Sequence, residues 1–159
     1  MESQFLYKAW ANERILDEIE KIDQVKYTDN FLKAKRLLNH THVVDRIFVA
    51  HLTNTSHPYA ATNTQDTPSV KDLRQYVRKT DEWLLQFSRN VSSSELNKTI
   101  SFIFTDGDFG EMSVLDILNH LVIHGAYHRG NIGMLLTDCG IAMPSDTFTR
   151  FLHNAASTV

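Results

Sequence analysis

The chain has 159 residues, of which 42% are hydrophobic and 22% charged, with a formal net charge of −3. This length and composition suit one globular domain with a full core, so we expect a single domain over residues 1–159. The negative net charge, with Lys and Arg scattered along the chain, argues against a nucleic-acid-binding surface. No apolar run approaches the roughly 20 residues that cross a bilayer, so we expect no membrane association.

The single cysteine and the first residues indicate the compartment. Cys139 has no second cysteine with which to form an intrachain disulfide, which fits a reducing environment. No signal peptide is visible at Met1-Glu2-Ser3-Gln4, which lacks a basic start and a following apolar segment. We therefore expect a cytoplasmic protein in which Cys139 has a structural role.

The first third of the chain predicts two amphipathic helices, over residues 4–22 and about 31–55. In the second helix, His40 falls within the apolar face set by its leucines and valines. His42 is rotated by about 200° from His40, at about 100° per residue, and is expected at the surface or rim. His57 is expected to be a helix-end cation near the macrodipole.

The middle of the chain predicts a long loop and a third helix. The polar segment 58–68 can reach roughly 36 Å at about 3.3 Å per residue, close to the length of a 24-residue helix. It is therefore long enough to return along the bundle and make the next helix parallel to the second. Ser69 is the expected N-cap of this third helix, which extends to about Ser88.

The last third of the chain predicts a short β-hairpin over residues 98–112, with a turn at Thr105-Asp106-Gly107-Asp108. Ser113 is the expected N-cap of a fourth helix over residues 114–138, and Ser145 or Asp146 that of a short last helix. The fold class is therefore mainly α: a four-helix bundle with a small hairpin before the fourth helix and a short C-terminal helix.

Three histidines recur at every fourth residue of the expected fourth helix: His120, His124 and His128. Residues at i and i+4 share a helix face about 6 Å apart, so His124 and His128 can meet one small ion. One helix supplies only two well-placed ligands, and His40 is the candidate for a third. The alternative is that these histidines are core residues with hydrogen-bonded ring nitrogens.

Three histidine nitrogens with an open fourth position are typical of a catalytic zinc-type site, although Ni, Fe or Mn also accept such ligands. The sequence lacks the zincin Glu, the Glu-x-x-His pairs of di-iron bundles, a phosphate-binding glycine loop and a G-x-S-x-G elbow. Arg129, beside the last histidine, either holds an anionic substrate group or pairs with a carboxylate such as Asp45.

At these positions the chain resembles the DinB family. The matching motifs are Trp10-Ala11-Asn12, Leu38-Asn39-His40, Val43-Val44-Asp45-Arg46-Ile47, His120-x-x-x-His124-x-x-x-His128-Arg129-Gly130-Asn131, and the later Gly140, Pro144 and Asp146. The resemblance implies an up-down-down-up four-helix bundle, a divalent metal held by His40, His124 and His128, and often a homodimer. Characterised relatives in the wider superfamily act as metal-dependent transferases or isomerases that use low-molecular-weight thiols.

The leading hypothesis is a divalent-metal-dependent enzyme that transfers a low-molecular-weight thiol to a small electrophilic substrate. In this hypothesis Arg129 or His120 orients the partner substrate. The alternative is a non-enzymatic, stress-responsive bundle that binds a metal or another ligand. A third hypothesis is a dimeric helical domain whose histidines are only core residues.

Overall fold

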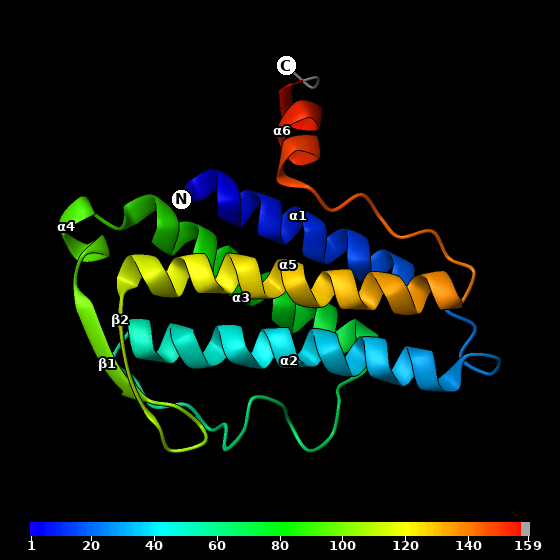
Figure 1. Ribbon diagram of the computed structural model, residues 1–159, viewed down its shortest axis with the longest axis horizontal. Coiled ribbons are helices and arrows are strands. Elements are labelled where there is room, and N and C mark those ends of the chain that lie inside the picture. The colour runs from blue at the N-terminus through cyan, green and yellow to red at the C-terminus, as the bar shows by residue number, and fades with distance from the viewer. Residues whose placement is uncertain (157–159) are drawn as a thin grey trace.

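A computed structural model describes residues 1–156. Four long helices form a bundle: α1 (Glu2–Ile19), α2 (Thr28–Leu52), α3 (Val70–Asn90) and α5 (Val114–Asp138). Helices α1 and α5 run in one direction, and α2 and α3 in the other (Figure 1). Helix α2 packs against α5, and α1 packs against α3. This is the expected up-down-down-up course, made possible by the long loop between α2 and α3.

The smaller elements lie outside the four long helices, with α4 and the hairpin at one end of the bundle and α6 on its side (Figure 1). A single turn of helix, α4 (Ser93–Leu96), which the sequence pattern did not predict, precedes the hairpin of β1 (Thr99–Ile103) and β2 (Phe109–Ser113). The two strands are antiparallel, as expected. The C-terminal helix α6 (Phe148–Ala156) packs its base against α1 through Phe148 and Phe151 and projects outward from the bundle (Figure 1).

The helix caps explain where the helices begin. The Ser69 hydroxyl accepts a hydrogen bond from the backbone N–H of Asp72, and Ser113 forms a capping box with Asp116, so both predicted N-caps are confirmed. The predicted cap of the last helix is wrong. Thr147 Oγ1 accepts a hydrogen bond from Arg150 N, whereas Asp146 is held by Arg129.

The second helix begins and ends three residues earlier than predicted. A turn at Asp23, whose carboxylate accepts hydrogen bonds from the backbone N–H groups of Val25 and Lys26, allows α2 to start at Thr28. Because α2 ends at Leu52, His57 lies in the following loop and is not at a helix end. The interpretation of His57 as a helix-end cation is therefore wrong.

The bundle interior has two apolar clusters, one near each end. One is built around Leu16, Leu38, Leu73 and Leu136, and the other around Phe5, Phe48, Leu84, Ile117 and Leu121. Along each of the four helices, buried polar or charged residues lie between the residues of these clusters: Lys8, Asn12, Asp45, Asp81 and Arg129. We call these five residues the polar layer.

Ion pairs and hydrogen bonds connect the polar layer. Lys8 Nζ donates to Asp45 Oδ2 at 2.6 Å and to Asp81 Oδ1 at 2.7 Å, and Asn12 Nδ2 donates to Asp81 Oδ2 at 2.8 Å. Arg129 Nη1 donates to Asn12 Oδ1 at 3.0 Å. Each polar group thereby gains a partner that offsets part of its desolvation cost.

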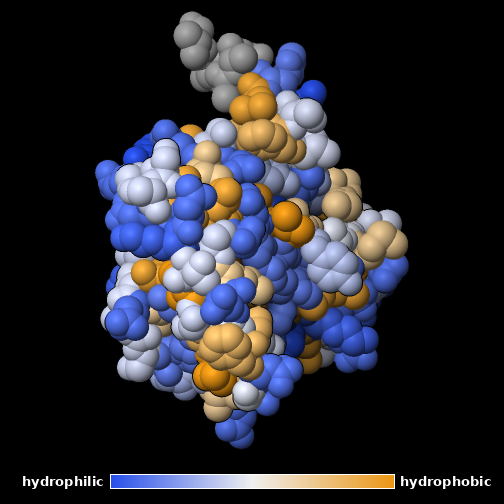
Figure 2. Space-filling model, turned by 60° about the vertical axis from the view of Figure 1, so that its left-hand side comes forward, coloured by the Kyte–Doolittle hydropathy of each residue, from blue (hydrophilic) through white to orange (hydrophobic). Residues whose placement is uncertain are grey.

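Hydrophilic residues cover much of the face that Figure 2 shows, and hydrophobic residues form separate patches there, one of them on the projecting C-terminal helix. Among the helices of residues 1–156, none combines the length and apolar character needed to cross a membrane.

Candidate metal centre

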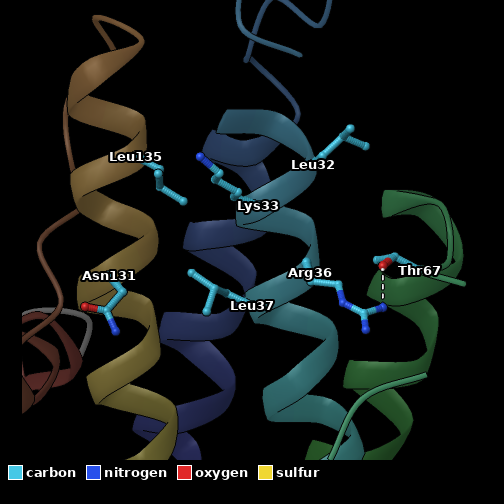
Figure 3. Close-up of a pocket in the computed structure, with 7 residues that line it drawn as sticks. All are labelled: Leu32, Lys33, Arg36, Leu37, Thr67, Asn131 and Leu135. Atoms are coloured by element: carbon cyan, nitrogen blue, oxygen red, sulfur yellow. Dashed lines mark hydrogen bonds between the residues drawn. The ribbon is translucent and has the colours of Figure 1, made fainter. Parts of the chain in front are cut away.

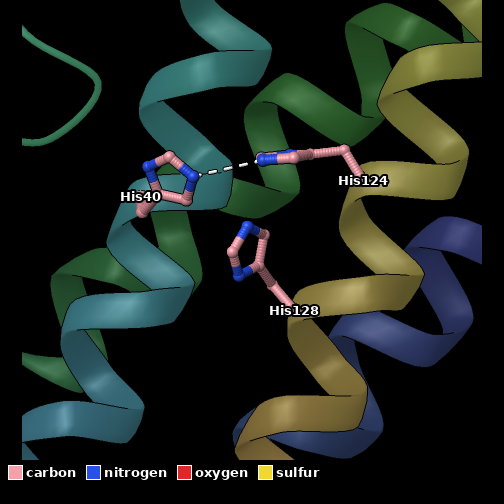
Figure 4. Close-up of side chains that lie close together, drawn as sticks. All are labelled: His40, His124 and His128. Carbon is pink, nitrogen blue, oxygen red and sulfur yellow. Dashed lines mark hydrogen bonds between the residues drawn. The ribbon is translucent and has the colours of Figure 1, made fainter.

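Three imidazoles from two helices converge on one side of the bundle. His40 extends from α2, and His124 and His128 extend from consecutive turns of α5 (Figure 4). His40 Nε2 lies 3.1 Å from His124 Nε2, and one nitrogen from each ring can be chosen so that all lie within 4.8 Å of one another. The i, i+4 spacing on α5 and the antiparallel packing of α2 thus bring together the three histidines that the sequence pattern predicted as candidate ligands.

The loop after α2 fixes the orientation of His40. Its Nδ1 lies 2.7 Å from the carbonyl oxygen of Thr62. A carbonyl can only accept, so Nδ1 carries the proton and donates it. In the neutral ring, Nε2 therefore presents its lone pair toward His124. Ligating histidines in metalloproteins commonly have such a carbonyl partner on the other ring nitrogen.

Burial keeps the histidines on α5 neutral. It lowers the pKa of His124 to about 3, and the electrostatic cost of a further charge beside His128, His120, His40 and Lys8 lowers it in the same direction. Burial, together with the proximity of His40, also lowers the pKa of His128. Neutral imidazole is the form that binds a metal ion, so these shifts favour ligation over protonation at neutral pH.

Several ring nitrogens near the trio have unused hydrogen-bonding capacity. The Nδ1 atoms of His124 and His128 are buried and have no hydrogen-bond partner. The two facing Nε2 atoms of His40 and His124 cannot both act as acceptors toward one another. A cation between the rings would satisfy the facing lone pairs, so the donor set fits a divalent metal ion that prefers nitrogen ligands.

His120 lies one turn before His124 and borders the trio. Its ring stacks on that of His124 with centroids 5.1 Å apart, and it also lies 5.2 Å from the ring of Phe48. Burial lowers its pKa, so it too is neutral at neutral pH. Within the described part of the chain, the group that could hold a metal consists of His40, His124 and His128, without His120.

Arg129 points into the bundle interior. It is 1% exposed, and its Nε donates to Asp146 Oδ2 at 2.7 Å. Of the two interpretations weighed for it, ion pairing describes its contacts, but the named partner was wrong because Asp45 is bonded to Lys8. Its remaining hydrogen bonds go to Asn12 and the hydroxyl of Tyr7.

The other histidines lie apart from the trio. His42 is on a different side of α2 from His40, as the rotation argument required, but it is 8% exposed and stacks on Tyr76 of α3. Its interpretation as a surface or rim residue is therefore wrong. His57 packs against His51, with ring centroids 5.5 Å apart. Cys139 is buried and belongs to an apolar cluster.

Sequence reasoning missed the contribution of Lys8, Asp81 and Asn12, which place charge and hydrogen bonds beneath the centre. A lysine at an otherwise apolar position of the first helix was the available signal. It also missed Thr62, because a backbone carbonyl leaves no trace in side-chain patterns.

Comparison with known proteins agrees with this geometry. The model of the DinB family matches residues 2–158. The curated "Protein DinB" of Bacillus subtilis (strain 168) is 24% identical over 159 residues, a match that covers 92% of this chain and 90% of that protein. No solved structure matches. Because the family model covers nearly the whole sequence, the chain belongs to the DinB family.

Proposed function

We propose that the protein is a divalent-metal-dependent enzyme that acts on a small molecule, with His40, His124 and His128 as the metal ligands. One observation carries the proposal: three imidazoles converge, and no fourth histidine, cysteine or carboxylate of the described residues joins them. A site with three protein ligands keeps a position for substrate or water, whereas structural zinc sites are closed by four.

The reaction we propose is transfer of a low-molecular-weight thiol to an electrophile. A divalent ion in this position acts as a Lewis acid and lowers the pKa of a bound thiol or water. The thiol part of the proposal is supported by the resemblance to a superfamily whose characterised members use such thiols. Reconstitution with Zn, Ni, Fe and Mn identifies which of these metals the site prefers.

We assign different roles to the two residues expected to orient the substrate. His120 borders the ligands and is half-buried, and we propose that its ring contacts a substrate at the centre. Arg129 has its guanidinium occupied by Asp146 and Asn12, and we propose that it positions α5 beneath the ligands without touching the substrate.

The three-ligand set favours an enzyme over a sensor that only binds metal. A binding-only site gains from saturating its metal with protein ligands, whereas catalysis needs an exchangeable position. The enzyme proposal therefore predicts turnover in addition to metal binding.

The test is metal analysis of purified, untagged protein before and after chelation and after reconstitution with each of the four metals. We expect about one divalent ion per chain in the wild type and in the matched control His57→Ala. We expect loss of the ion in His40→Ala and His124→Ala with the helical circular dichroism retained. Full metal occupancy in His124→Ala would contradict the assignment of His124 as a ligand. If the wild type binds none of the four metals, the proposed metal-dependent reaction is excluded.

A protein loaded with metal then enters a screen of small thiols against electrophiles such as activated alkenes and epoxides. We expect thiol consumption that depends on the metal and is lost in His124→Ala. Metal binding with no turnover across the screen would favour the sensor hypothesis.

Homodimerisation and a cytoplasmic location stay predictions. The outer face of α5 exposes Ile123 and Tyr127, each about two-thirds exposed at 67% and 66%, which is the kind of surface that a second copy can cover. Sedimentation of the wild type and of Ile123→Lys/Tyr127→Lys would test dimerisation through this face.

A further inference from the structure

A groove lies over α2, between α5 and the end of the loop that follows α2, and its nearest lining residues, Leu37 and Asn131, are three residues from His40 and His128. Its cavity has a volume of about 570 Å³, and the residues that line it include Lys33, Arg36 and Leu37 of α2 and Asn131 and Leu135 of α5 (Figure 3). This volume lies within the roughly 300–1,000 Å³ range of small-molecule sites. None of these residues belongs to the metal centre.

Helix geometry places the groove and the histidines on the same faces. Lys33, Leu37 and His40 follow one another at i, i+4 and i+7 on α2. His128, Asn131 and Leu135 have the spacing i, i+3 and i+7 on α5. Because α2 and α5 run antiparallel, both stripes lead away from the ligands in the same direction (Figure 1). At 1.5 Å per residue, Lys33 and Leu135 each lie about 10 Å from the ligand level along the helix axis.

The lining is apolar with positive charge at its far end. Leu37 and Leu135 are half-buried at the edge of an apolar cluster. Lys33 is exposed, extends from α2 over the groove in Figure 3, and has no ion-pair partner within residues 1–156. None of the described residues that line the cavity is acidic.

The second cation of the groove has a different task. Arg36 donates through Nη1 to Thr64 O, Gln65 O and Thr67 Oγ1, at 2.5, 3.3 and 3.2 Å. All three acceptors are neutral, so its charge adds to the positive potential while its hydrogen bonds anchor the loop. Lys33 is left as the cation free to meet a ligand.

We propose that this groove binds the substrate of the metal centre, and that the substrate is a small linear organic acid. Its apolar chain lies between Leu37 and Leu135, its carboxylate meets Lys33, and its opposite end is directed at the three histidines. The carboxylate and the apolar chain of the substrate are inferred from the charge and lining of the groove. The placement of the opposite end of the substrate at the histidines rests on the proposed function. The roughly 10 Å between Lys33 and the ligand level sets the length of the chain.

The first test uses metal-free protein and octanoate, with octanol as a neutral probe of equal length, and calorimetry as the readout. We expect octanoate to bind Lys33→Gln roughly tenfold more weakly than the wild type, the effect of losing one charge-assisted hydrogen bond. Octanol should not distinguish the two. Lys98→Gln, which removes another exposed lysine, at the start of the hairpin, is the matched control and should bind octanoate like the wild type. Lys33 is exposed, so its replacement leaves the core intact.

Methyl NMR places the ligand, and octanoate should shift the resonances of Leu37 and Leu135. Equal binding of octanoate and octanol to the wild type, no effect of Lys33→Gln, or shifts confined to other residues would each overturn the inference.

A second test separates the groove from the proposed function. In His124→Ala, octanoate binding should persist with the same dependence on Lys33. The groove would then be shown to bind octanoate even if the three histidines bind no metal. In zinc-loaded wild type, the ω-mercapto derivative of octanoic acid should bind more tightly than octanoate, and this gain should vanish in His124→Ala. Zinc binding without that gain would overturn the inference that the groove and the metal centre share one ligand.

Discussion

The Nδ1 nitrogen of His40 donates a hydrogen bond to the carbonyl oxygen of Thr62 at 2.7 Å, which ties the metal centre to a loop without regular secondary structure. The loop is in turn fastened to α2. Asn39 donates to Asn63 Oδ1 and to Thr64 Oγ1, and Asn63 Nδ2 donates to the backbone carbonyl of Arg36. The tautomer of His40 thus depends on the side-chain amides of Asn39 and Asn63, which hold the loop that carries Thr62.

Replacing Asn63 with Ala should loosen this loop and leave the position of Thr62 less well defined. Because outer contacts of this kind typically contribute 10–100-fold to metal affinity, we expect zinc to bind about tenfold more weakly. Competition with a chromogenic chelator measures this effect, and Asn90→Ala, at the end of α3, serves as the control. Unchanged zinc affinity in Asn63→Ala, with the fold retained, would show that the Thr62 contact does not matter for binding.

The ion pair of Arg129 and Asp146 connects α5 to the segment before α6, with side chains 1% and 9% exposed. Replacing Arg129 with Met leaves a carboxylate with little solvent and no cation, and breaking such a pair typically costs about 3–5 kcal/mol of unfolding free energy. Urea denaturation measures the loss. Arg150→Met, at an exposed position of α6, should change the stability by less than about 0.5 kcal/mol.

This prediction separates two roles for Arg129. A positioning role predicts that Asp146→Asn also destabilises the protein and that the two single losses are not additive in the double variant. A variant Arg129→Met that is as stable as the wild type but fails to bind substrate would instead restore the substrate-binding interpretation.

Periodicity and capping signals were enough to predict most of the fold. Helix α5 begins after Ser113 and ends at Asp138, as expected, because its cap and the following glycine at position 140 are local signals. The histidine trio was also predictable, since the i, i+4 rule placed two ligands and the apolar stripe of α2 placed His40 on the facing side. These features depend on residues close together in the sequence.

The polar layer was not predicted because its contacts join residues far apart in the chain. Lys8 pairs with Asp45 and Asp81, which are 37 and 73 residues away, and no spacing rule connects them. For the same reason, Asp45 was wrongly predicted as the ion-pair partner of Arg129. His42 was expected near the surface because the sequence of α2 alone does not show that Tyr76 of α3 covers it. Long-range partners decide which polar residues are buried.

The polar layer gives stability a defined pH dependence. Lys8 is one cation between two carboxylates, and burial raises the pKa of Asp45 to about 6 although Lys8 acts in the opposite direction. The ordinary value of 3.8 applies to the unfolded chain, so the folded state binds this proton more tightly. The stability that this carboxyl contributes is therefore complete below about pH 4 and is lost as the pH rises through about 6.

Replacing Asp45 with Asn removes that dependence. We expect the stability of the wild type relative to Asp45→Asn to fall between pH 4 and pH 7 by up to about 3 kcal/mol, the equivalent of two pKa units. Urea unfolding of both proteins at several pH values gives this difference, in which the titration of the histidines cancels. Asp138→Asn, at an exposed position, is the control, and a difference for Asp45→Asn that stays constant with pH would contradict the prediction.

Two glycines of α5 should respond to different extents to alanine. A Cβ on Gly133 would lie 2.5 Å from Met143 Sδ and 2.7 Å from its Cγ, whereas a Cβ on Gly130 meets nothing within 4 Å. Alanine within a helix gains about 1 kcal/mol over glycine, so Gly130→Ala should stabilise the protein by about that amount. In Gly133→Ala the flexible side chain of Met143, which is 45% exposed, must shift, so Gly133→Ala should stabilise the protein by less than Gly130→Ala.

A double-mutant cycle isolates the contact. With Met143 shortened to Ala, the Gly133→Ala substitution loses its clash, so its stabilising effect should be larger in that background. Thermal or urea unfolding of the four proteins provides the cycle. Because Met143 lies in the segment that follows α5, a larger gain in the Met143→Ala background would show that Gly133 lets that segment pass close to the helix, and equal effects in both backgrounds would exclude it.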